Sequence, residues 1–298
     1  MSGRWLMAAL ALGCGRGDDA PRTAFDGVRA LALVETQLAF GPRVPGTEAH
    51  RRCGDWLAAE LRTRADTVVE QRWAHVTAAG DTLPLRNLFA RFRPGIPERV
   101  LLVAHWDSRP RSDKARDPAR RALPVPGAND GASGVAVLLA LAEALEHEAP
   151  LFGVDLLLVD GEDYGEFDAR RDVLLGSTYF ASHLPEPGYR PLFGVLLDMV
   201  GDADLRFLKE IHSLRGAPEV VARVWQTADA LGYGHVFVDR EGWEVTDDHL
   251  PLLAAGLRVV DVVDIEYPWH HTPDDTADKL SARSLQIVGD VALSLVSD

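Results

Sequence analysis

Cysteine is scarce in this chain of 298 residues, which carries only Cys14 and Cys53. Structural zinc sites favour thiolate ligands, so two cysteines are too few to build one. If Cys14 is modified as argued below, Cys53 has no cysteine partner and the folded domain has no internal disulfide. We then expect Cys53 to be a small buried apolar residue of an amphipathic helix.

Positively charged residues are also few: the chain has 31 Lys and Arg against 45 Asp and Glu, and its formal net charge is −14. Nucleic-acid binding depends on clustered Lys and Arg, and the seven tryptophans form no stripe beside basic residues. We therefore expect no nucleic-acid partner. The composition, 47% hydrophobic and 26% charged, is that of an ordinary globular protein and excludes a disordered or fibrous chain.

Long hydrophobic runs are absent as well, since the N-terminal run Trp5 to Leu12 is too short to span a bilayer. With Arg4 before it and Gly13-Cys14 after it, this run resembles a bacterial lipoprotein signal, whose cysteine becomes lipidated. We expect an export signal over residues 1–14, a tether over 15–24, and a lipid-anchored protein of the cell envelope or periplasm. The alternative is a frayed apolar N-terminus.

Helical and extended patterns alternate from Phe25 to the C-terminus. Apolar spacing and end signals, with Thr47 as a cap, predict helices over 28–40, 47–61, 135–145, 220–231 and 284–296. Alternating or continuous apolar runs predict strands over 67–76, 83–92, 99–104, 154–159, 193–197 and 257–263. This alternation predicts a single three-layer α/β domain over residues 25–298, and we expect a monomer.

Two loops, 108–126 and 164–175, are long for a compact domain. Long loops of this kind are usually functional or mobile. The first loop contains the charge run Arg109 to Arg121, which we expect to be solvated.

Five side chains of the types that bind metals lie at the ends of predicted strands or in turns: His105, Asp130, Asp163, Asp198 and His271. Neutral imidazole and carboxylate oxygen are the ligands of zinc sites that keep a position open for catalysis. The set therefore predicts a catalytic zinc site.

Each motif also has a simpler interpretation when it is taken alone. His105 and its neighbour Asp107, which could hold the second ring nitrogen, could be a solvated turn. Asp130 could cap the helix that begins near Ala132. Adjacent carboxylates such as Glu162 and Asp163 repel each other unless a cation lies between them, which favours a ligand beside a general base.

Taken together, the motifs resemble the zinc peptidase family that contains the co-catalytic zinc aminopeptidases and the animal-type glutaminyl cyclases. The resemblance covers about residue 25 to the C-terminus and implies a mixed central sheet flanked by helices, an αβα sandwich with the metal site at the strand ends. The matching segments are His105-Trp106-Asp107-Ser108, Gly127-Ala128-Asn129-Asp130, Asp160-Gly161-Glu162-Asp163, Leu196-Leu197-Asp198, Asp247-Asp248-His249-Leu250-Pro251 and His271-Thr272 with Asp275.

The resemblance also implies roles for individual residues. Asp130, Asp163 and His271 match the zinc ligands of both branches, and Glu162 matches the catalytic acid/base. His105 and Asp198 match the ligands of a second zinc in aminopeptidases, whereas cyclases retain this pair around a single zinc. The ligand set is therefore common to both branches.

Other positions favour the cyclase branch. Asp247 matches a hydrogen-bonding partner of the cyclase reaction, where aminopeptidases more commonly have Ser. The sequence departs from the cyclases at Asp163, where they have Glu, and at His270, where they have a pocket Trp. We expect Asp248, His249, Trp269 and His270 to lie in the pocket or behind the ligands, and Trp106 and Trp243 to shape an apolar pocket.

The expected function is that of a zinc-dependent glutaminyl-peptide cyclotransferase, which converts the N-terminal Gln of peptides to pyroglutamate and releases ammonia. Glu162 would transfer the proton, and Asp198 and Asp247 would hold the intermediate. One alternative is an aminopeptidase with two zinc ions instead of one. The other is a zinc-retaining envelope binding protein with little catalysis.

Overall fold

The computed structural model describes residues 25–147 and 149–297. The predicted export signal, the tether and Cys14 lie outside these residues. No helix in the described ranges is both long and apolar enough to cross a membrane.

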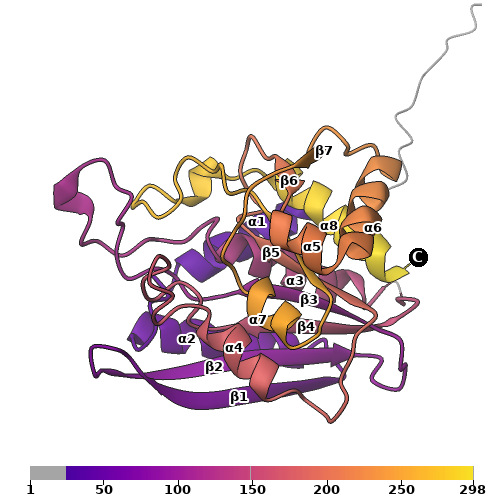
Figure 1. The fold of residues 1–298 in the computed structure, drawn as a ribbon, viewed down its shortest axis with the longest axis horizontal. Coiled ribbons are helices and arrows are strands. Elements are labelled where there is room, and N and C mark those ends of the chain that lie inside the picture. The colour runs from indigo at the N-terminus through magenta and orange to yellow at the C-terminus, as the bar shows by residue number, and fades with distance from the viewer. Residues whose placement is uncertain (1–24, 148, 298) are drawn as a thin grey trace, which may run out of the picture.

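A six-stranded mixed sheet forms the centre of the domain, in the order β1-β2-β4-β3-β5-β8 (Figure 1). The first two strands are an antiparallel pair, and β2 also runs antiparallel to β4. Strands β4, β3, β5 and β8 are parallel to one another. Their bounds are β1 Thr67–Val76, β2 Thr82–Phe92, β3 Arg99–His105, β4 Gly153–Val159, β5 Phe193–Asp198 and β8 Val259–Val263.

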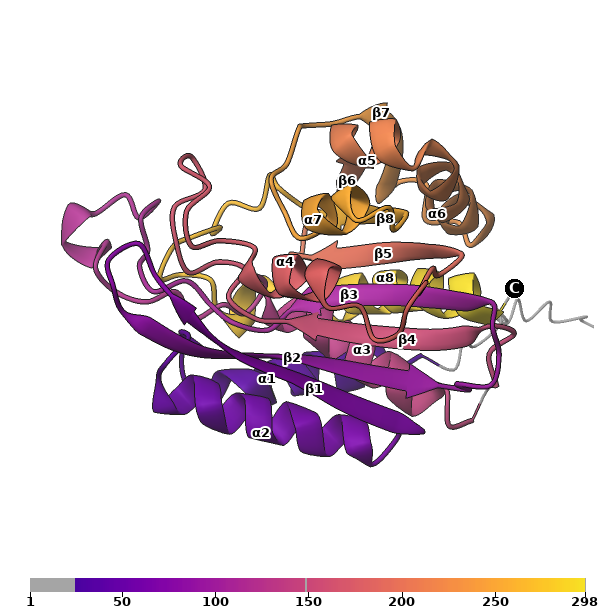
Figure 2. The ribbon, with the colours of Figure 1, turned by 60° about the horizontal axis from the view of Figure 1, so that its bottom comes forward.

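Helices cover both faces of this sheet (Figure 2). The larger apolar core joins one face to α1 Gly27–Leu38, α2 Glu48–Arg62, α3 Ala132–Ala144, α6 Pro218–Ala230 and α8 Ala282–Ser297. A smaller core joins the other face to α4 Leu175–Ser182 and α7 His249–Ala254. The predicted three-layer single domain with a mixed sheet is confirmed.

The predicted strands and long helices are all present, within a few residues of the expected ends. Thr47 caps α2 by accepting from the backbone N–H of His50, and Cys53 is a free, fully buried residue of that helix. Several short elements were not predicted: α4, α7, α5 Ile211–Gly216, the single-turn helices Pro118–Arg120 and Ala277–Lys279, and the two-stranded sheet of β6 Phe207–Lys209 and β7 Phe237–Glu241.

The parallel strands bring their carboxyl ends to one edge of the sheet, where α/β proteins place their ligands. His105 is the last residue of β3, and Asp198 is the last residue of β5. Glu162 and Asp163 follow β4 by a few residues. The fold thus brings four of the predicted site residues to the same edge.

Candidate active site

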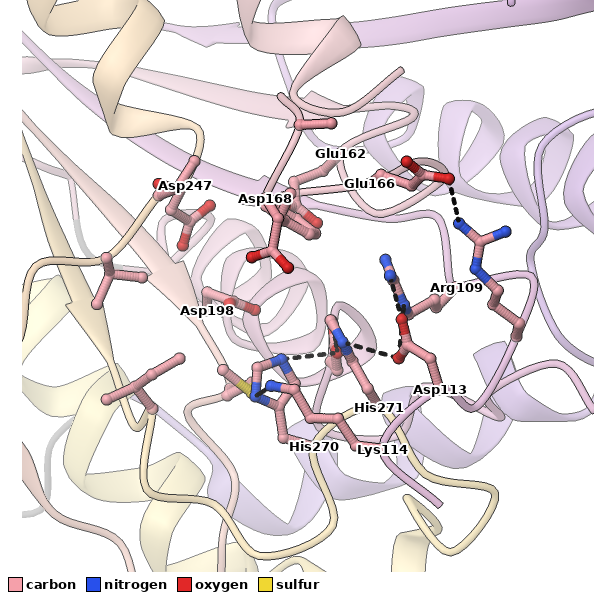
Figure 3. Close-up of a pocket in the computed structure, with 18 of the residues that line it drawn as sticks. Arg109, Asp113, Lys114, Glu162, Glu166, Asp168, Asp198, Asp247, His270 and His271 are labelled. Carbon is pink, nitrogen blue, oxygen red and sulfur yellow. Dashed lines mark hydrogen bonds and ion pairs between the residues drawn. The ribbon is translucent and has the colours of Figure 1, made fainter. Parts of the chain in front are cut away.

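A cavity of about 580 Å³ opens at this edge of the sheet. Figure 3 shows the carboxylates of Glu162, Asp198 and Asp247 and the imidazoles of His270 and His271 around it. Asp198 ends β5, and the other side chains come from separate loops that follow β4 and β8 or precede α7. The long loops 108–126 and 164–175 supply much of the rim.

His105 lies between two carboxylates. Its Nε2 is 3.2 Å from Oδ1 of Asp130 and 3.2 Å from Oδ1 of Asp198. One ligand-type atom from each of these three buried residues lies within 4.8 Å of the others, a spacing that could hold a metal ion.

His271 lies on the other side of Asp130. Its Nε2 is 3.6 Å from Oδ2 of Asp130 and 3.2 Å from Oδ1 of Asp163. Asp130, His270 and His271 form a second group with ligand-type atoms within 4.8 Å of one another. Asp130 therefore directs one carboxylate oxygen toward each histidine group.

His271 has a backbone conformation that non-glycine residues rarely adopt, with φ of 54°. Such positions cost of order 1–3 kcal/mol and are retained where the surroundings fix them. Here the carbonyl oxygen of His271 accepts a hydrogen bond from the backbone N–H of Lys114 at 3.2 Å. The loop 108–126 thus helps to hold the histidine in place.

Asp107 fixes the turn that carries Glu162 and Asp163. Its Oδ1 accepts from the backbone N–H of Glu162 at 3.1 Å, and its Oδ2 accepts from that of Asp163 at 3.2 Å. The Nδ1 of His105 lies 3.5 Å from Asp107 Oδ1 and has no hydrogen-bond partner in the part of the chain that the structure describes. Asp107 thus bonds directly to the turn after β4, a contact that the sequence analysis did not anticipate.

Asp275 fixes the turn that carries Asp130 in the same way. Its two oxygens accept from the backbone N–H groups of Asn129 at 2.9 Å and Asp130 at 3.2 Å, and Tyr267 donates its hydroxyl at 2.8 Å. The residue that precedes α3 is Gly131, and no side chain caps the helix. The capping interpretation of Asp130 is therefore wrong, and its carboxylate is free to face the histidines.

Arg109 is buried beside Asp163, which corrects the expectation that the charge run Arg109 to Arg121 is solvated. Its Nη1 donates to Oδ1 of Asp163 at 2.6 Å, and its Nη2 donates to Oδ2 of Asp113 at 2.6 Å. The guanidinium also lies 5.7 Å from the ring centroid of Phe167. The start of the run is therefore part of the site wall.

Burial and mutual repulsion strongly affect the carboxylates of the cavity. Burial raises the pKa of Glu162 well above its usual range, and the charges of Asp163 and Asp247 add to the effect, although His105 opposes it. Burial and the charge of Asp198 likewise raise the pKa of Asp247 well above its usual range. Burial and mutual repulsion therefore disfavour the charged forms of these groups, and a bound cation would relieve both.

His271 and Asp130 are instead shifted toward their charged forms. Burial lowers the pKa of His271, but Asp163 and the other carboxylates overcome this and raise it to about 9. Burial raises the pKa of Asp130, but the hydrogen bond from His105 and the charges of the histidines lower it overall. The cluster of carboxylates thus attracts positive charge.

The donor atoms fit a zinc ion. Oδ2 of Asp130 and Oδ2 of Asp163 are buried and have no hydrogen-bond partner among the described residues. Buried carboxylate oxygens are normally paired or coordinate a metal. Imidazole nitrogen and carboxylate oxygen are also the donor set of catalytic zinc sites.

His270 lines the cavity beside His271, and a second contact constrains its chemistry. The ammonium of Lys114 lies 3.0 Å from its Nδ1 and can only donate. A neutral His270 that accepts at Nδ1 carries its proton on Nε2, which faces Asp130 Oδ2 at 3.9 Å. This proton argues against Nε2 of His270 as a metal ligand.

The prediction that Trp106, Trp243 and Trp269 shape the pocket was wrong. Trp106 is fully buried away from the cavity, where its ring stacks on His50 at 4.2 Å between centroids. Trp243 and Trp269 are partly exposed and do not line the cavity, and the ring of Trp269 lies 5.0 Å from the ammonium of Lys279.

Asp248 and His249 lie behind the wall that Asp247 forms. Ser177 donates its hydroxyl to Asp248. Nε2 of His249 is 3.2 Å from Oε2 of Glu210, whose other oxygen accepts from the backbone N–H of Val245 at 3.1 Å. Neither residue lines the cavity, so of the two predicted places, in the pocket or behind the ligands, both residues lie behind the cavity wall and support it.

Four contributors to the site were not predicted from the sequence: Arg109, Asp113, Lys114 and Glu210. Arg109 follows the His105-Trp106-Asp107 motif closely, and this proximity in the sequence could have indicated that it belongs to the site. Glu210 gave no signal, because its partners Val245 and His249 lie far along the chain.

Buried imidazoles and carboxylates at the carboxyl ends of parallel strands define an α/β metalloenzyme. The chain belongs to peptidase family M28, whose model matches residues 87–296. It is an enzyme of either the peptidase or the glutaminyl cyclase type, and the resemblance inferred from its motifs is confirmed.

Two curated relatives represent these two types. Aminopeptidase YwaD of Bacillus subtilis (strain 168) is 28% identical over 210 residues, which cover 67% of this chain and 41% of that protein. The glutaminyl-peptide cyclotransferase-like protein of Bos taurus is 26% identical over 276 residues, which cover 79% of this chain and 66% of that protein. The chain thus spans between 41% and 66% of the length of these relatives.

Solved structures match over nearly their whole length. The glutaminyl cyclase of Bacteroides thetaiotaomicron bound to N-acetylhistamine has a TM-score of 0.88 and 36% identity, covering 92% of this chain and 98% of its own. The Zn-dependent exopeptidase of Parabacteroides distasonis ATCC 8503 has a TM-score of 0.88 and 37% identity, with the same coverage. The chain is therefore equally similar to solved glutaminyl cyclases and to solved exopeptidases. The types of the donor atoms and the relatives both support zinc as the metal.

Proposed function

We propose that this protein is a zinc-dependent glutaminyl-peptide cyclotransferase that acts on the N-terminal Gln of peptides. The proposal depends on the carboxyl groups of Glu162, Asp198 and Asp247, which line one cavity and are all largely buried. Cyclisation moves a proton from an attacking amine to a departing amine, so it benefits from several groups that can hold or share protons. The raised pKa values of these three groups support that assignment.

Asp130, Asp163 and His271 would hold one zinc ion, with His105 and Asp198 beside it. When bound, zinc supplies Lewis acidity that polarises a carbonyl oxygen. Glu162 would accept a proton from the α-amine as this nitrogen forms a bond to the side-chain amide carbon of Gln. The same carboxyl group would return the proton to the amide nitrogen, which leaves as ammonia.

Asp198 and Asp247 would orient the reacting groups through hydrogen bonds. Oδ2 of Asp247 is buried without a partner among the described residues, so it is available to a bound substrate. Its Oδ1 accepts from the backbone N–H of Asp248 at 2.6 Å, which fixes the carboxyl group relative to the start of α7.

An aminopeptidase with two zinc ions is the second candidate, and one observation favours it. Asp130 directs Oδ1 toward His105 and Oδ2 toward His271, as a carboxylate that bridges two metal ions would. In that case His105 and Asp198 would complete the second metal site, and Glu162 would activate water for attack on the first peptide bond.

The two reactions differ in their products. The zinc-loaded protein is incubated with Gln-initiated and Leu-initiated peptides of otherwise equal sequence. A cyclotransferase releases ammonia from the Gln peptide and leaves the Leu peptide intact, whereas an aminopeptidase releases free amino acid. Absence of both products would favour a zinc-retaining binding protein, for which an unliganded base such as Glu162 has no use.

A further inference from the structure

The rim of the cavity is strongly charged, and most of its charges are already neutralised. Among the exposed rim residues, Asp113 pairs with Arg109 at 2.6 Å and Glu244 pairs with Arg215 at 2.6 Å. Glu166 pairs with Arg171.

Two charged residues of the rim are not neutralised in this way. Lys114 and Asp168 line the cavity, and neither makes an ion pair within residues 25–147 and 149–297, although the charges of Asp130, Asp113 and Asp163 act on Lys114 from a greater distance. Figure 3 shows them on opposite sides of the cavity. An incoming anion is repelled by Asp168, so Lys114 is the side of the rim that can receive it.

Lys114 differs from the other basic residues of the cavity. Arg109 is occupied by two carboxylates, and Arg111 donates to the carbonyl oxygen of Gly165 at 3.3 Å with Glu166 4.0 Å away. The ammonium of Lys114 makes its hydrogen bond to a neutral acceptor, Nδ1 of His270. An ammonium has three donors, so two remain for a ligand.

The position of Lys114 also fits a ligand that extends from the reacting centre. A single imidazole ring separates its ammonium from Asp130, with 3.0 Å to Nδ1 of His270 on one side and 3.9 Å from Nε2 to Asp130 on the other. Consecutive Cα atoms of a peptide lie about 3.8 Å apart. A group one residue beyond the substrate's N-terminal residue therefore falls within reach of Lys114.

We propose that Lys114 binds a carboxylate of the second substrate residue, and so makes the enzyme selective for short or acidic peptides. The carboxylate is the C-terminus of a dipeptide or the side chain of an acidic second residue. For the identity of the first residue, this inference rests on the proposed cyclotransferase function. Lys114 acts here as a specificity residue that contributes to binding and takes no part in proton transfer.

The test compares peptides that differ only in this charge, with full-length zinc-loaded protein. The first pair is Gln-Ala as the free acid and as the C-terminal amide, and the second is Gln-Glu amide and Gln-Gln amide. We expect the charged member of at least one pair to have a KM about three- to fivefold lower, with similar kcat, as for an exposed or half-exposed ion pair. The pair that responds identifies the source of the carboxylate.

Variants assign the preference to Lys114. Lys114→Met should remove it by raising KM for the charged peptide alone, and Lys114→Arg should retain part of it. Lys209→Met is the matched control, since Lys209 pairs with Asp239 away from the cavity and its loss should leave the preference intact. Added salt should weaken the wild-type preference.

Equal KM values within both pairs, or a preference that survives Lys114→Met, would overturn the inference. Failure of the proposed function gives a different result, because no Gln peptide would then release ammonia. If Leu peptides release free leucine instead, the same comparison is made with Leu-Ala acid and amide and with Leu-Glu and Leu-Gln amides. The role of Lys114 is thereby tested in either reaction.

Discussion

Arg109 donates to Oδ1 of Asp163 at 2.6 Å and leaves Oδ2 of the same carboxylate without a partner among the described residues. The oxygen that Arg109 holds is also the one that lies 3.2 Å from Nε2 of His271. The remaining donors of Arg109 bind Asp113 at 2.6 Å and 3.1 Å, which fixes the guanidinium in turn. Arg109, which the sequence places in a loop expected to be solvated, therefore orients the candidate metal ligand Asp163.

Replacing this arginine should destabilise the metal-free protein more than the zinc-loaded protein. In Arg109→Met the buried Asp163 loses its cation, and breaking a buried pair costs about 3–5 kcal/mol. Bound zinc restores positive charge, so the variant should gain more thermal stability from zinc than the wild type does. Thermal unfolding with chelator and with saturating zinc measures the difference.

Arg120→Met provides the control for this variant. It removes an exposed pair with Asp274, and exposed pairs contribute only about 0–1 kcal/mol. Equal zinc stabilisation in Arg109→Met and wild type would contradict the position assigned to Arg109.

Glu162→Gln should retain zinc and lose most turnover. The amide is close in size but cannot accept and return a proton, and general acid/base groups contribute about 10²- to 10⁴-fold. Zinc content after dialysis and kcat on the preferred substrate are the two measurements. Glu98→Gln, at an exposed position away from the cavity, should keep activity near that of wild type, and near wild-type kcat in Glu162→Gln would refute the role.

The number of zinc ions separates the two candidate reactions. For the cyclotransferase, activity should reach its maximum at about one zinc per chain, because three protein ligands and one open position complete a catalytic site. His271→Ala should empty that site, whereas His105→Ala should reduce activity and leave the metal bound. Activity that requires a second equivalent, lost selectively in His105→Ala, would support the aminopeptidase instead.

Glu210 should contribute to stability in a defined acidic range. Burial raises the pKa of its carboxyl group, but the imidazole of His249, 3.2 Å away, and the hydrogen bond from the backbone N–H of His212 more than offset this and lower the pKa to about 2, against an ordinary value of 4.5. A folded-state pKa below the unfolded value gives stability that is present above about pH 4.5 and is lost as the pH falls toward 2.

Glu210→Gln tests this range. Urea unfolding from acidic to neutral pH should show a flatter pH dependence in the variant than in wild type. At neutral pH the variant should unfold with about 1–3 kcal/mol less free energy, because hydrogen bonds to a charged acceptor are lost. Parallel curves for the two proteins would show that Glu210 does not titrate as described.

The N-terminal proposal has a separate test, since Cys14 lies outside the described residues. If Cys14 is lipidated, Cys14→Ala should move the protein from the membrane fraction to the soluble fraction. The activity of the purified domain should not change. Membrane association that persists in Cys14→Ala would assign the attachment to another feature.

Much of the fold follows from local sequence signals. The run Arg99 to Ala104 is apolar on both faces, as a strand between two helical layers must be, and it forms the buried strand β3. Short helices such as α4 were missed because tertiary contacts stabilise them. Phe180 of α4 packs on Phe89 of β2, with ring centroids 5.5 Å apart.

The site was predictable where a residue's role depends on its own motif, and it was missed where the role depends on a distant partner. His105 and Asp198 come together because each ends a parallel strand. Arg109 meets Asp163 across 54 positions of sequence, which no local pattern encodes. Trp106 was misplaced because adjacent residues at the end of a strand point to opposite faces, so the neighbour of His105 enters the core.

Asp107 and Asp275 each bind two successive backbone amides in a turn that carries a candidate ligand. Ordering the backbone of one residue costs about 1–2 kcal/mol of conformational entropy. In these two turns the backbone is already ordered when the protein folds. A metal ion that binds there would therefore not have to order these two turns. Zinc binding should therefore be fast and fully reversible. It should lack the slow rearrangement that accompanies ion binding to a loop without such hydrogen bonds.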